Sequence, residues 1–439
     1  QGNLNGGEGE QQQSGNRFYQ FLNDYVYTAG GDLSKNFRAF DANQTVKIGY
    51  LLQVRDRLFD SKPFANYLPS HNTALRRLGP ADIFNPTHFG TEANQFAFDQ
   101  ISGSIYRYMA NNILNAGFIQ FDNQFSPALR VVWGVRVEHF DQLLGSVKTW
   151  DARHAHTKVT DFLPGVNATI RLNTKTNLRF SGSQTVVRPE LRELASFQFY
   201  DFDLNATVQG SPGLQRTRIT NADIRYELYP GAGETFSVGI FYKHFDKPIE
   251  QIFQKGGGGS SIFNFANPEK AGAYGAELEL RKKLDFLDAL KNFTFLTNLS
   301  YIKSQVSDKK LELDRPLQGQ SSYLINAGIL YDHEKAGINA SILYNQIGER
   351  IAYVGTIGNG GDFSPDIWES SRPLLDFQAG KKMMKSKGEI RLTISDILNQ
   401  KVYFYQNTDG NTKLDKGVDA YRFTRQFGTT FSLTFGYNF

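Results

Sequence analysis

The sequence predicts an all-β fold in which antiparallel strands form the wall of a barrel that spans an outer membrane. Three observations support this prediction: apolar and polar residues alternate along most of the chain, short turns alternate with long polar stretches, and no run approaches the ~20 apolar residues of a membrane helix. Hydrophobic residues make up 40% of the 439 residues, and the mean hydropathy is −0.43. These bulk values are also expected of a barrel, because its apolar and polar faces average out.

The alternation has a period of two residues, which places successive side chains on opposite faces of a strand. In the segment 129–138 the odd-numbered positions are apolar, and the even-numbered positions include Arg130, Arg136 and Glu138. The same pattern recurs over 46–54, 221–228, 236–243, 274–281, 323–331 and 338–345, whereas 111–125 fits either register. We count about 15 strands of about 10 or more residues, which is the length of a tilted membrane strand.

The connections between these strands fall into two classes. Short turns rich in Pro, Gly, Asn and Asp are predicted at 126–128, 173–177, 230–234, 332–337 and 385–388. Long polar stretches lie between them, near 60–108, 142–158, 188–217, 246–270, 304–319, 346–372 and 400–426. This rhythm is typical of outer-membrane barrels, which have periplasmic turns and long extracellular loops. We therefore expect residues 1–43 to form a polar loop with room for one first strand, and residues 44–439 to form the transmembrane wall and its extracellular loops.

The C-terminal segment is the clearest two-faced strand. From residue 431 onward large apolar residues alternate with small or polar ones, and five of them share one face: Phe431, Leu433, Phe435, Tyr437 and Phe439. Chain termini are usually polar and frayed, so a terminus of this kind needs an apolar environment. We expect this face to contact outer-membrane lipid. A soluble β-sandwich would also have one apolar face, but it gives no reason for every long loop to lie at the same end.

Few residues suggest metal or catalytic chemistry. The absence of cysteine excludes thiol nucleophiles and cysteine-based metal sites. His154 and His156 could share a strand face as metal ligands, but we interpret them as loop residues; the segment 407–416 resembles a calcium loop, yet Tyr405 and Lys416 stand where that loop needs ligands. No catalytic set is localised, so we predict no enzyme, no metal and no cofactor. The net charge of +4 is spread along the chain and gives no reason to expect a nucleic-acid partner.

Several motifs occur together and in one order. The segment 163–202 contains a strand, a turn, a strand and then "RPELREL", and further motifs follow at 222–251, 266–284, 315–331 and 392–405. As a set they resemble TonB-dependent receptors of the Bacteroidota, in which an "ARPEFREL"-like loop follows such a strand pair. In that family the last of these segments, "LTISDILNQKVYFY", is similar to the penultimate strand. The resemblance covers most of the chain from about residue 40 onward.

The resemblance implies active import of a scarce nutrient across the outer membrane, powered by TonB, which pulls on a plug domain. Family members have about 22 strands and a plug, whereas this chain has about 15 strands and nothing that resembles a plug. We therefore expect the chain to be the C-terminal part of a receptor barrel, with the plug and the first strands supplied from upstream. A non-transporting barrel that serves as a scaffold, or as a subunit of a surface or secretion complex, is the alternative.

The resemblance and the periodicity together give three sets of candidate residues. Candidates for the ligand site or the lumen mouth are Arg188, Glu190, Arg192 and Glu193. Candidates for a wall that faces the plug are Arg136, Arg179, Arg225, Glu277 and Arg281. The barrel-assembly signal is expected at Phe435, Tyr437 and Phe439. The expected partners are outer-membrane lipid, the plug and upstream strands, the TonB complex and the barrel-assembly machinery, with a surface lipoprotein left open.

Overall fold

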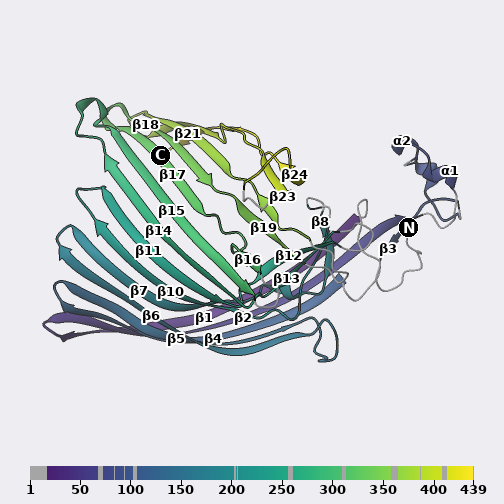
Figure 1. Cartoon of the computed structure of the whole chain (residues 1–439), viewed down its shortest axis with the longest axis horizontal. Coiled ribbons are helices and arrows are strands. Elements are labelled where there is room, and N and C mark those ends of the chain that lie inside the picture. The colour runs from purple at the N-terminus through teal and green to yellow at the C-terminus, as the bar shows by residue number, and fades with distance from the viewer. Residues whose placement is uncertain are drawn as a thin grey trace.

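The computed structural model describes residues 17–438 apart from 68–72, 84, 93, 102–105, 202–203, 205, 256–260, 309–312, 357–363, 386 and 408–412. Most of the described residues lie in strands, which confirms the all-β prediction. The strands form two sheets, a long wall sheet and a smaller sheet built from the loops at one end of the wall (Figure 1).

Within the described residues, fifteen strands of the wall pair antiparallel with their neighbours in chain order. They are β1 (Arg17–Ala39), β2 (Ala42–Tyr67), β4 (Arg107–Ser126), β5 (Leu129–Leu144), β6 (Ala155–Asn173), β7 (Thr176–Val187), β10 (Thr217–Leu228), β11 (Thr235–Asp246), β14 (Lys270–Lys283), β15 (Phe293–Asp308), β17 (Tyr323–His333), β18 (Ile338–Ile347), β21 (Arg372–Met383), β22 (Gly388–Ser395) and β25 (Thr430–Tyr437). Two short strands, β3 (Ala97–Gln100) and β16 (Leu313–Arg315), extend this sheet at the loop end.

The register aligns residues of one kind across neighbouring strands. Leu278 of β14 lies opposite Val238 of β11 and Leu299 of β15, all three apolar. The adjacent residue Glu277 lies opposite Gly239 and Ser300. Because side chains alternate between faces, these two rows lie on opposite sides of the wall. The wall therefore has an apolar face and a polar face, as the period-two pattern predicts.

The short connections lie together at one end of the wall, at the left of Figure 1. The turns predicted from Pro, Gly, Asn and Asp are confirmed between β4 and β5, β6 and β7, β10 and β11, β17 and β18, and β21 and β22. The turn between β1 and β2 was missed, because its two residues are Phe40 and Asp41. Both have positive φ, 53° and 55°, which is the geometry of a type I′ hairpin turn normally made by Asn and Gly. The Phe40 ring contacts that of Phe125 at 5.3 Å.

The long connections are more ordered than their polar composition predicts. Four of them supply two strands each to a second sheet of eight strands. In sheet order these are β8 (Gln198–Asp201), β9 (Ala206–Gln209), β13 (Ser261–Ala266), β12 (Glu250–Lys255), β19 (Arg350–Gly355), β20 (Ile367–Glu369), β23 (Val402–Gln406) and β24 (Ala420–Arg425). We call this second sheet the loop sheet. In Figure 1 it lies right of centre, at the end of the wall opposite the short turns, and β1 and β2 extend past it.

The segment 392–405 differs from its sequence-based interpretation as one penultimate strand. The wall strand β22 ends at Ser395, and residues from Val402 onward form β23 of the loop sheet instead. Ser370 N donates to the Tyr403 carbonyl at 2.9 Å, which joins this part of the chain to the loop that carries β20. The final strand β25 pairs with β22, and its apolar residues are open to the surroundings, with Phe431 and Leu433 exposed by 70% and 71%.

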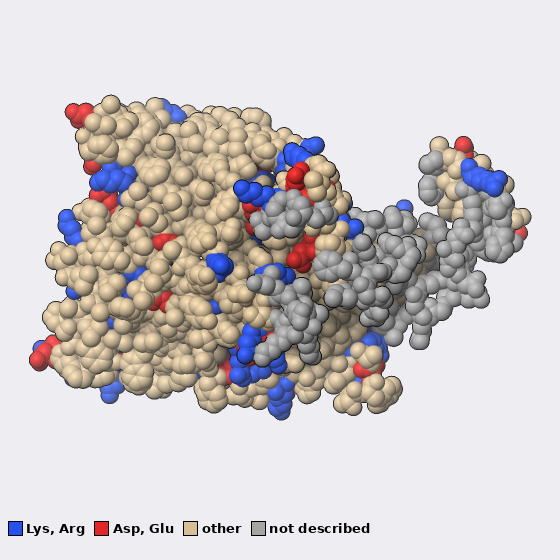
Figure 2. All heavy atoms as spheres, in the orientation of Figure 1, with Lys and Arg blue, Asp and Glu red and all other residues tan. Residues whose placement is uncertain are grey.

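The helices are short. They are α1 (Thr73–Arg76), α2 (Pro80–Ile83) and α3 (Leu191–Leu194), with 3-10 turns η1 (Pro86–His88), η4 (Asp288–Leu290) and η5 (Glu334–Ala336). Among the described residues, no helix is both long enough and apolar enough to cross a membrane. On the face drawn in Figure 2, uncharged residues cover most of the wall, and Lys, Arg, Asp and Glu gather near the loop sheet.

Candidate functional site

The loop between β7 and β10, residues 188–216, folds back onto the polar face of the wall. Its helix α3 buries Leu191 and Leu194 in a cluster with Phe59 of β2, Tyr108 of β4 and Leu144 of β5. Phe59 also contacts Phe197 of the loop, with ring centroids 4.8 Å apart. The cluster holds this loop against one side of the wall, so that its polar residues lie at the loop end of the lumenal face.

Arg188 attaches this loop to the wall by ion pairs. Its Nη2 donates to Glu138 Oε2 at 2.7 Å and lies 3.3 Å from Asp161 Oδ2, and its guanidinium lies 4.5 Å from the ring centroid of Phe140. Asp161 is almost fully buried, and its other oxygen accepts from Arg216 Nε at 2.8 Å. A buried carboxylate between two guanidinium groups is satisfied by charge-assisted hydrogen bonds. The contacts of Arg188 therefore position the loop.

The other three candidates of the "RPELREL" segment have different surroundings. Glu193 Oε2 accepts from the backbone N–H of Glu190 at 2.8 Å, a capping interaction at the start of α3. Arg192 donates to the carbonyls of Phe197 and Val208 at 3.1 and 3.2 Å, and burial lowers its pKa to about 10. Burial raises the pKa of the Glu193 carboxyl above its ordinary value. Of the four candidates, Glu193 lines the cavity described next.

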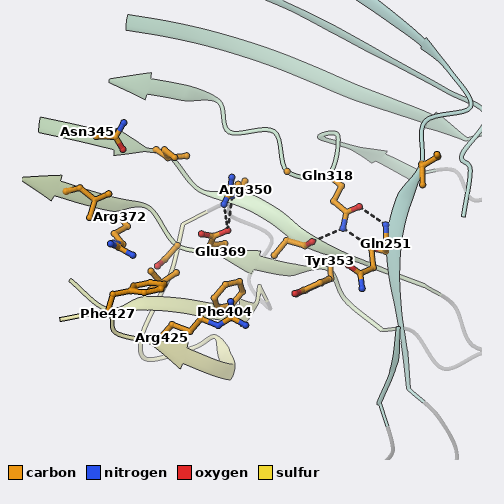
Figure 3. Close-up of a pocket in the computed structure, with 18 of the residues that line it drawn as sticks. Gln251, Gln318, Asn345, Arg350, Tyr353, Glu369, Arg372, Phe404, Arg425 and Phe427 are labelled. Carbon is orange, nitrogen blue, oxygen red and sulfur yellow. Dashed lines mark hydrogen bonds and ion pairs between the residues drawn. The ribbon is translucent and has the colours of Figure 1, made fainter. Parts of the chain in front are cut away.

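A cavity of about 620 Å³ lies between the loop sheet and the wall. The wall contributes Asn345 and Ile347 of β18 and Arg372 and Leu374 of β21. The remaining lining residues come mainly from the loop sheet and its connections: Ile249, Gln251, Phe265, Gln318, Gly319, Gly348, Arg350, Ala352, Tyr353, Glu369, Ser370, Val402, Phe404, Arg425 and Phe427. Figure 3 shows these side chains converging from both sides. Asn345 and Arg372 lie on the polar face of the wall, so the cavity opens on the lumenal side.

Guanidinium groups in the cavity are paired with carboxylates or stacked on rings (Figure 3). Arg350 reaches Glu369 Oε2 through both Nε and Nη2, at 2.8 and 2.7 Å. Arg372 Nη2 donates to Asp396 Oδ2 at 3.1 Å, and its guanidinium carbon lies 4.5 Å from the ring centroid of Phe427. Pairs of this kind fix the direction of each planar group before any ligand arrives.

A second buried ion pair fixes the rim of this cavity. Glu250 of β12 is 1% exposed at its side chain and accepts from Arg315 Nη2 at 2.5 Å and Nη1 at 3.0 Å. The neighbouring Gln318 joins three loops: its N–H donates to Glu250 Oε1, and its side-chain amide donates to the carbonyls of Gln251 and Ala352 at 3.0 and 2.7 Å. The loops around the cavity are therefore held together by polar contacts.

The predicted plug-facing residues lie on the polar face of the wall. Arg225 lies opposite Arg179 and pairs with Glu277 across β11, with Nη2 3.1 Å from Oε2. Arg179 pairs with Glu227 at 3.0 Å, and Arg136 pairs with Glu138 at 2.6 Å. Arg281 lies on the same face of β14 and is exposed, near the end with the short turns. The structure thus groups Arg179, Arg225 and Glu277 in one row, with Arg136 and Arg281 elsewhere on that face.

The histidine pair and the predicted assembly-signal residues can also be located in the structure. His154 lies in the loop before β6, as predicted, and its Nδ1 lies 2.6 Å from the Ser146 carbonyl. His156 lies in β6 rather than in a loop, and its Nε2 lies 2.8 Å from Asp141 Oδ1. In the part of the chain that the structure describes, no cluster of three or more His, Asp or Glu side chains has metal-binding geometry. Of the assembly-signal residues, Phe435 and Tyr437 lie on the apolar face of β25, and Phe439 lies outside the described residues.

Sequence reasoning missed most of the cavity. Arg350, Arg372, Arg425 and Phe427 lie in or next to the stretches 346–372 and 400–426, which were predicted only as polar loops. The available signal was local: both stretches combine arginine with aromatic residues, as in "YRFTRQF" at 421–427. Their convergence depends on pairing between loops that lie far apart in the sequence, which no local pattern reveals.

These features define a class of protein: an outer-membrane β-barrel wall whose loops enclose a lumenal cavity. The chain belongs to the outer membrane protein beta-barrel family, whose model matches residues 84–435. This assignment places it in the outer membrane, as predicted. The sequence has no significant match among curated proteins.

The solved structures with similar folds include a transporter and two receptors that are named for import or uptake. The ferric citrate transporter FecA has a TM-score of 0.64 at 12% identity, and the match covers 97% of this chain and 56% of FecA. The ferric-catecholate import receptor Fiu from E. coli has a TM-score of 0.61 at 11% identity, covering 95% and 55% of the two chains. The ferric yersiniabactin uptake receptor FyuA from Yersinia pestis has a TM-score of 0.59 at 10% identity, covering 96% and 55%. At these identities the likeness shows the fold alone, and the chain spans little more than half of each receptor.

Proposed function

We propose that this chain is the C-terminal part of a TonB-dependent receptor of the Bacteroidota type that imports a scarce nutrient across the outer membrane. The observation that carries the proposal is the lumenal cavity, which the loop sheet and the wall enclose at the end opposite the short turns. A substrate held there lies at the entrance to the lumen. The fold neighbours are named as a transporter and import receptors, which supports transport rather than catalysis.

The polar face of the wall fits the remainder of this mechanism. Ion pairs such as Arg225–Glu277 and Arg179–Glu227 line the lumen and leave polar side chains for a plug domain to contact. Strands that complete a barrel of about 22 strands, and the plug, are supplied by polypeptide outside this chain. In this proposal energised TonB pulls on the plug and opens the path from the cavity to the periplasm. A surface lipoprotein is a further partner that the long loops leave room for.

The proposal is tested by following nutrient consumption in the native host. Spent medium from wild-type cells, a receptor-deletion strain and a strain without TonB is compared by mass spectrometry. We expect at least one compound to be consumed by wild-type cells and left behind by both deletion strains, because both lack the same import step. Consumption that is normal in the receptor deletion, together with loss of a surface complex, would instead support the scaffold function.

A further inference from the structure

A row of tyrosines crosses the apolar face of the wall on the side of the loop sheet. Tyr242 of β11 lies directly opposite Tyr274 of β14, and Tyr301 of β15 lies opposite Ala276, the next outward position of β14. These three strands run side by side in Figure 1, and the three tyrosines are 49%, 52% and 62% exposed. Tyrosine is enriched where lipid meets water, because its ring is apolar and its hydroxyl is polar. The row therefore marks one boundary of the apolar band.

The length of β15 places this boundary at the expected height. The strand begins with Phe293 at the end with the short turns, where its ring lies 4.9 Å from that of Tyr331. From Phe293 to Lys303 the strand rises about 34 Å along its own axis, which a tilt of about 40° reduces to about 26 Å across the membrane. The apolar band of such barrels is about 25 Å tall. Lys303 therefore lies where the band ends on the side of the loop sheet.

Lys303 shares this boundary with two of the tyrosines. It lies directly opposite Tyr274 and two positions from Tyr301, so all three residues are on the outward face. Among the described residues, the ammonium group of Lys303 and the hydroxyl groups of Tyr274 and Tyr301 have no hydrogen-bond or ion-pair partner. The adjacent outward positions are uncharged: Gly272, Ala276 and Gln305. This small area thus offers one positive charge and two hydroxyl donors.

The nearest acidic positions of this face lie farther from the membrane. By backbone register Asp246 is opposite Lys270, and Asp314 is opposite Ser307, which itself pairs with Lys270. Both are in a row four positions beyond Lys303, or about 13 Å along the strand. At the other boundary of the band, Lys282 of β14 has a counter-ion within the chain, because its Nζ lies 2.7 Å from Glu234 Oε1. The chain supplies no such carboxylate beside Lys303.

We infer that Lys303, Tyr274 and Tyr301 bind the phosphate group of a lipid headgroup in the outer leaflet. The ammonium group attracts the phosphate, and the two hydroxyl groups donate to its oxygens. The acyl chains of the same lipid lie along the apolar face, where Leu278 and Leu299 follow the tyrosines. The long loops of such barrels are extracellular, so this boundary belongs to the outer leaflet. The inference concerns how the wall is held in the membrane and does not depend on what the protein transports.

The test uses the full-length protein in detergent and lipids that differ only in their headgroups. Dioleoylphosphatidic acid carries a free phosphate, dioleoylphosphatidylcholine carries a phosphate joined to a cation, and dioleoylglycerol carries none. Native mass spectrometry measures how much of each lipid is bound. We expect phosphatidic acid to bind at least about fivefold more tightly than either of the others, because one lysine at a membrane surface contributes about this factor towards an anionic headgroup.

Variants assign the effect to this site. Lys303→Gln should lower the affinity for phosphatidic acid about fivefold and leave that for the other two lipids unchanged. Lys303→Arg, which keeps the charge, should retain the preference. Tyr301→Phe should weaken phosphatidic acid by a smaller factor, because it removes a donor and keeps the ring. Lys335→Gln is the matched control: this exposed lysine lies in the turn between β17 and β18, at the other end of the wall, so its loss should change nothing. Heat-modifiable gel mobility confirms that each variant is folded.

Three results would overturn the inference. The first is equal binding of phosphatidic acid and dioleoylglycerol, or an affinity for phosphatidic acid that Lys303→Gln leaves unchanged. The second is complete displacement of phosphatidic acid by excess inorganic phosphate, which would mean that the site takes free phosphate rather than a lipid. The third is a dimer in the same spectra that Tyr301→Ala dissociates, because a second copy of the chain would then cover this face.

Discussion

At the scale of single residues, buried ion pairs decide where the loops lie. Arg188 is held by Glu138 and Asp161 of the wall, and Arg315 is held by Glu250 of a neighbouring loop. A buried pair of this kind adds little net stability over an apolar contact, but removing one partner leaves a charge without compensation. These pairs therefore specify the position of each loop more than they strengthen the whole fold.

The Glu250–Arg315 pair leads to the first prediction. Glu250→Gln keeps the size of the side chain but leaves the Arg315 charge partly buried, and we expect a cost of about 3–5 kcal/mol to the local stability of the loops. Hydrogen exchange of residues 250–255 and 313–318 measures it. Glu389→Gln is the control: its pair with Arg391 is open to solvent, so its removal should leave the protection of residues 250–255 and 313–318 unchanged. Equal protection in both variants would contradict the role given to Glu250.

At the scale of elements, the wall was predictable and the loop sheet was not. The wall strands are mostly ten residues or longer, so period-two alternation accumulates over several repeats, as in β10 and β14. The strands of the loop sheet have three to six residues, too few for a pattern. Their parallel pairings are shorter still: Ile252–Phe253 with Val354–Gly355, and Ile262–Phe263 with Thr207–Val208. Only tertiary packing around Phe253 and Phe263 determines them.

The same contrast applies to the candidate site. The "RPELREL" motif predicted residues at the ligand site or the lumen mouth, and Glu193 from it lines the cavity, while a role in ligand binding stays a prediction. The motif could not show that Glu193 lines the cavity whereas Arg188 attaches the loop to the wall. That distinction depends on Asp161 and Glu138, which lie in other strands. The sequence around Arg188 shows only which residue types are present. The role of Arg188 depends on Asp161 and Glu138, which lie 27 and 50 positions away in the sequence.

The two faces of the wall give the second prediction. Leu278→Arg places a charge on the apolar face, and we expect a destabilisation of about 2–4 kcal/mol if the site is near the bilayer midplane. Ser300→Arg places the same charge on the polar face, opposite Glu277, and should cost much less. Folded yield and heat-modifiable gel mobility of the two variants are compared. Equal tolerance of both changes would mean that the apolar face does not contact lipid.

At the scale of the whole molecule, the two ends of the wall differ, and this gives the third prediction. We expect the loop-sheet end to face the cell exterior and the short turns to face the periplasm. The chain has no cysteine, so Thr149→Cys in the loop between β5 and β6, or Ala232→Cys in the turn after β10, introduces a single reactive site. An impermeant maleimide applied to intact cells should label position 149 and spare position 232. Labelling of position 232 without labelling of position 149 would mean that the short turns face the cell exterior.

The edges of the wall sheet give the last prediction. Among the described residues, β1 pairs with β2 alone and β25 pairs with β22 alone, so the wall has two edges rather than a closed circumference. An edge strand in hydrocarbon leaves backbone N–H and C=O groups without partners, at several kcal/mol for each group, and only closed barrels avoid this cost. The exposed apolar face of β25 shows that the strand is suited to lipid, so its edge needs a neighbouring strand.

We therefore expect residues 1–439 expressed alone to aggregate or to be degraded, and the same residues to assemble when the strands and plug proposed to precede them are co-expressed. Assembly is measured by heat-modifiable gel mobility and by protease resistance of β25. As a control, Thr434→Pro, on the edge strand, should block assembly in the co-expressed pair, because proline removes a backbone donor and fits poorly inside a paired strand. A closed, protease-resistant monomer formed by residues 1–439 alone would contradict the prediction, since it would require β1 and β25 to pair directly, and it would favour a self-sufficient scaffold over a receptor part.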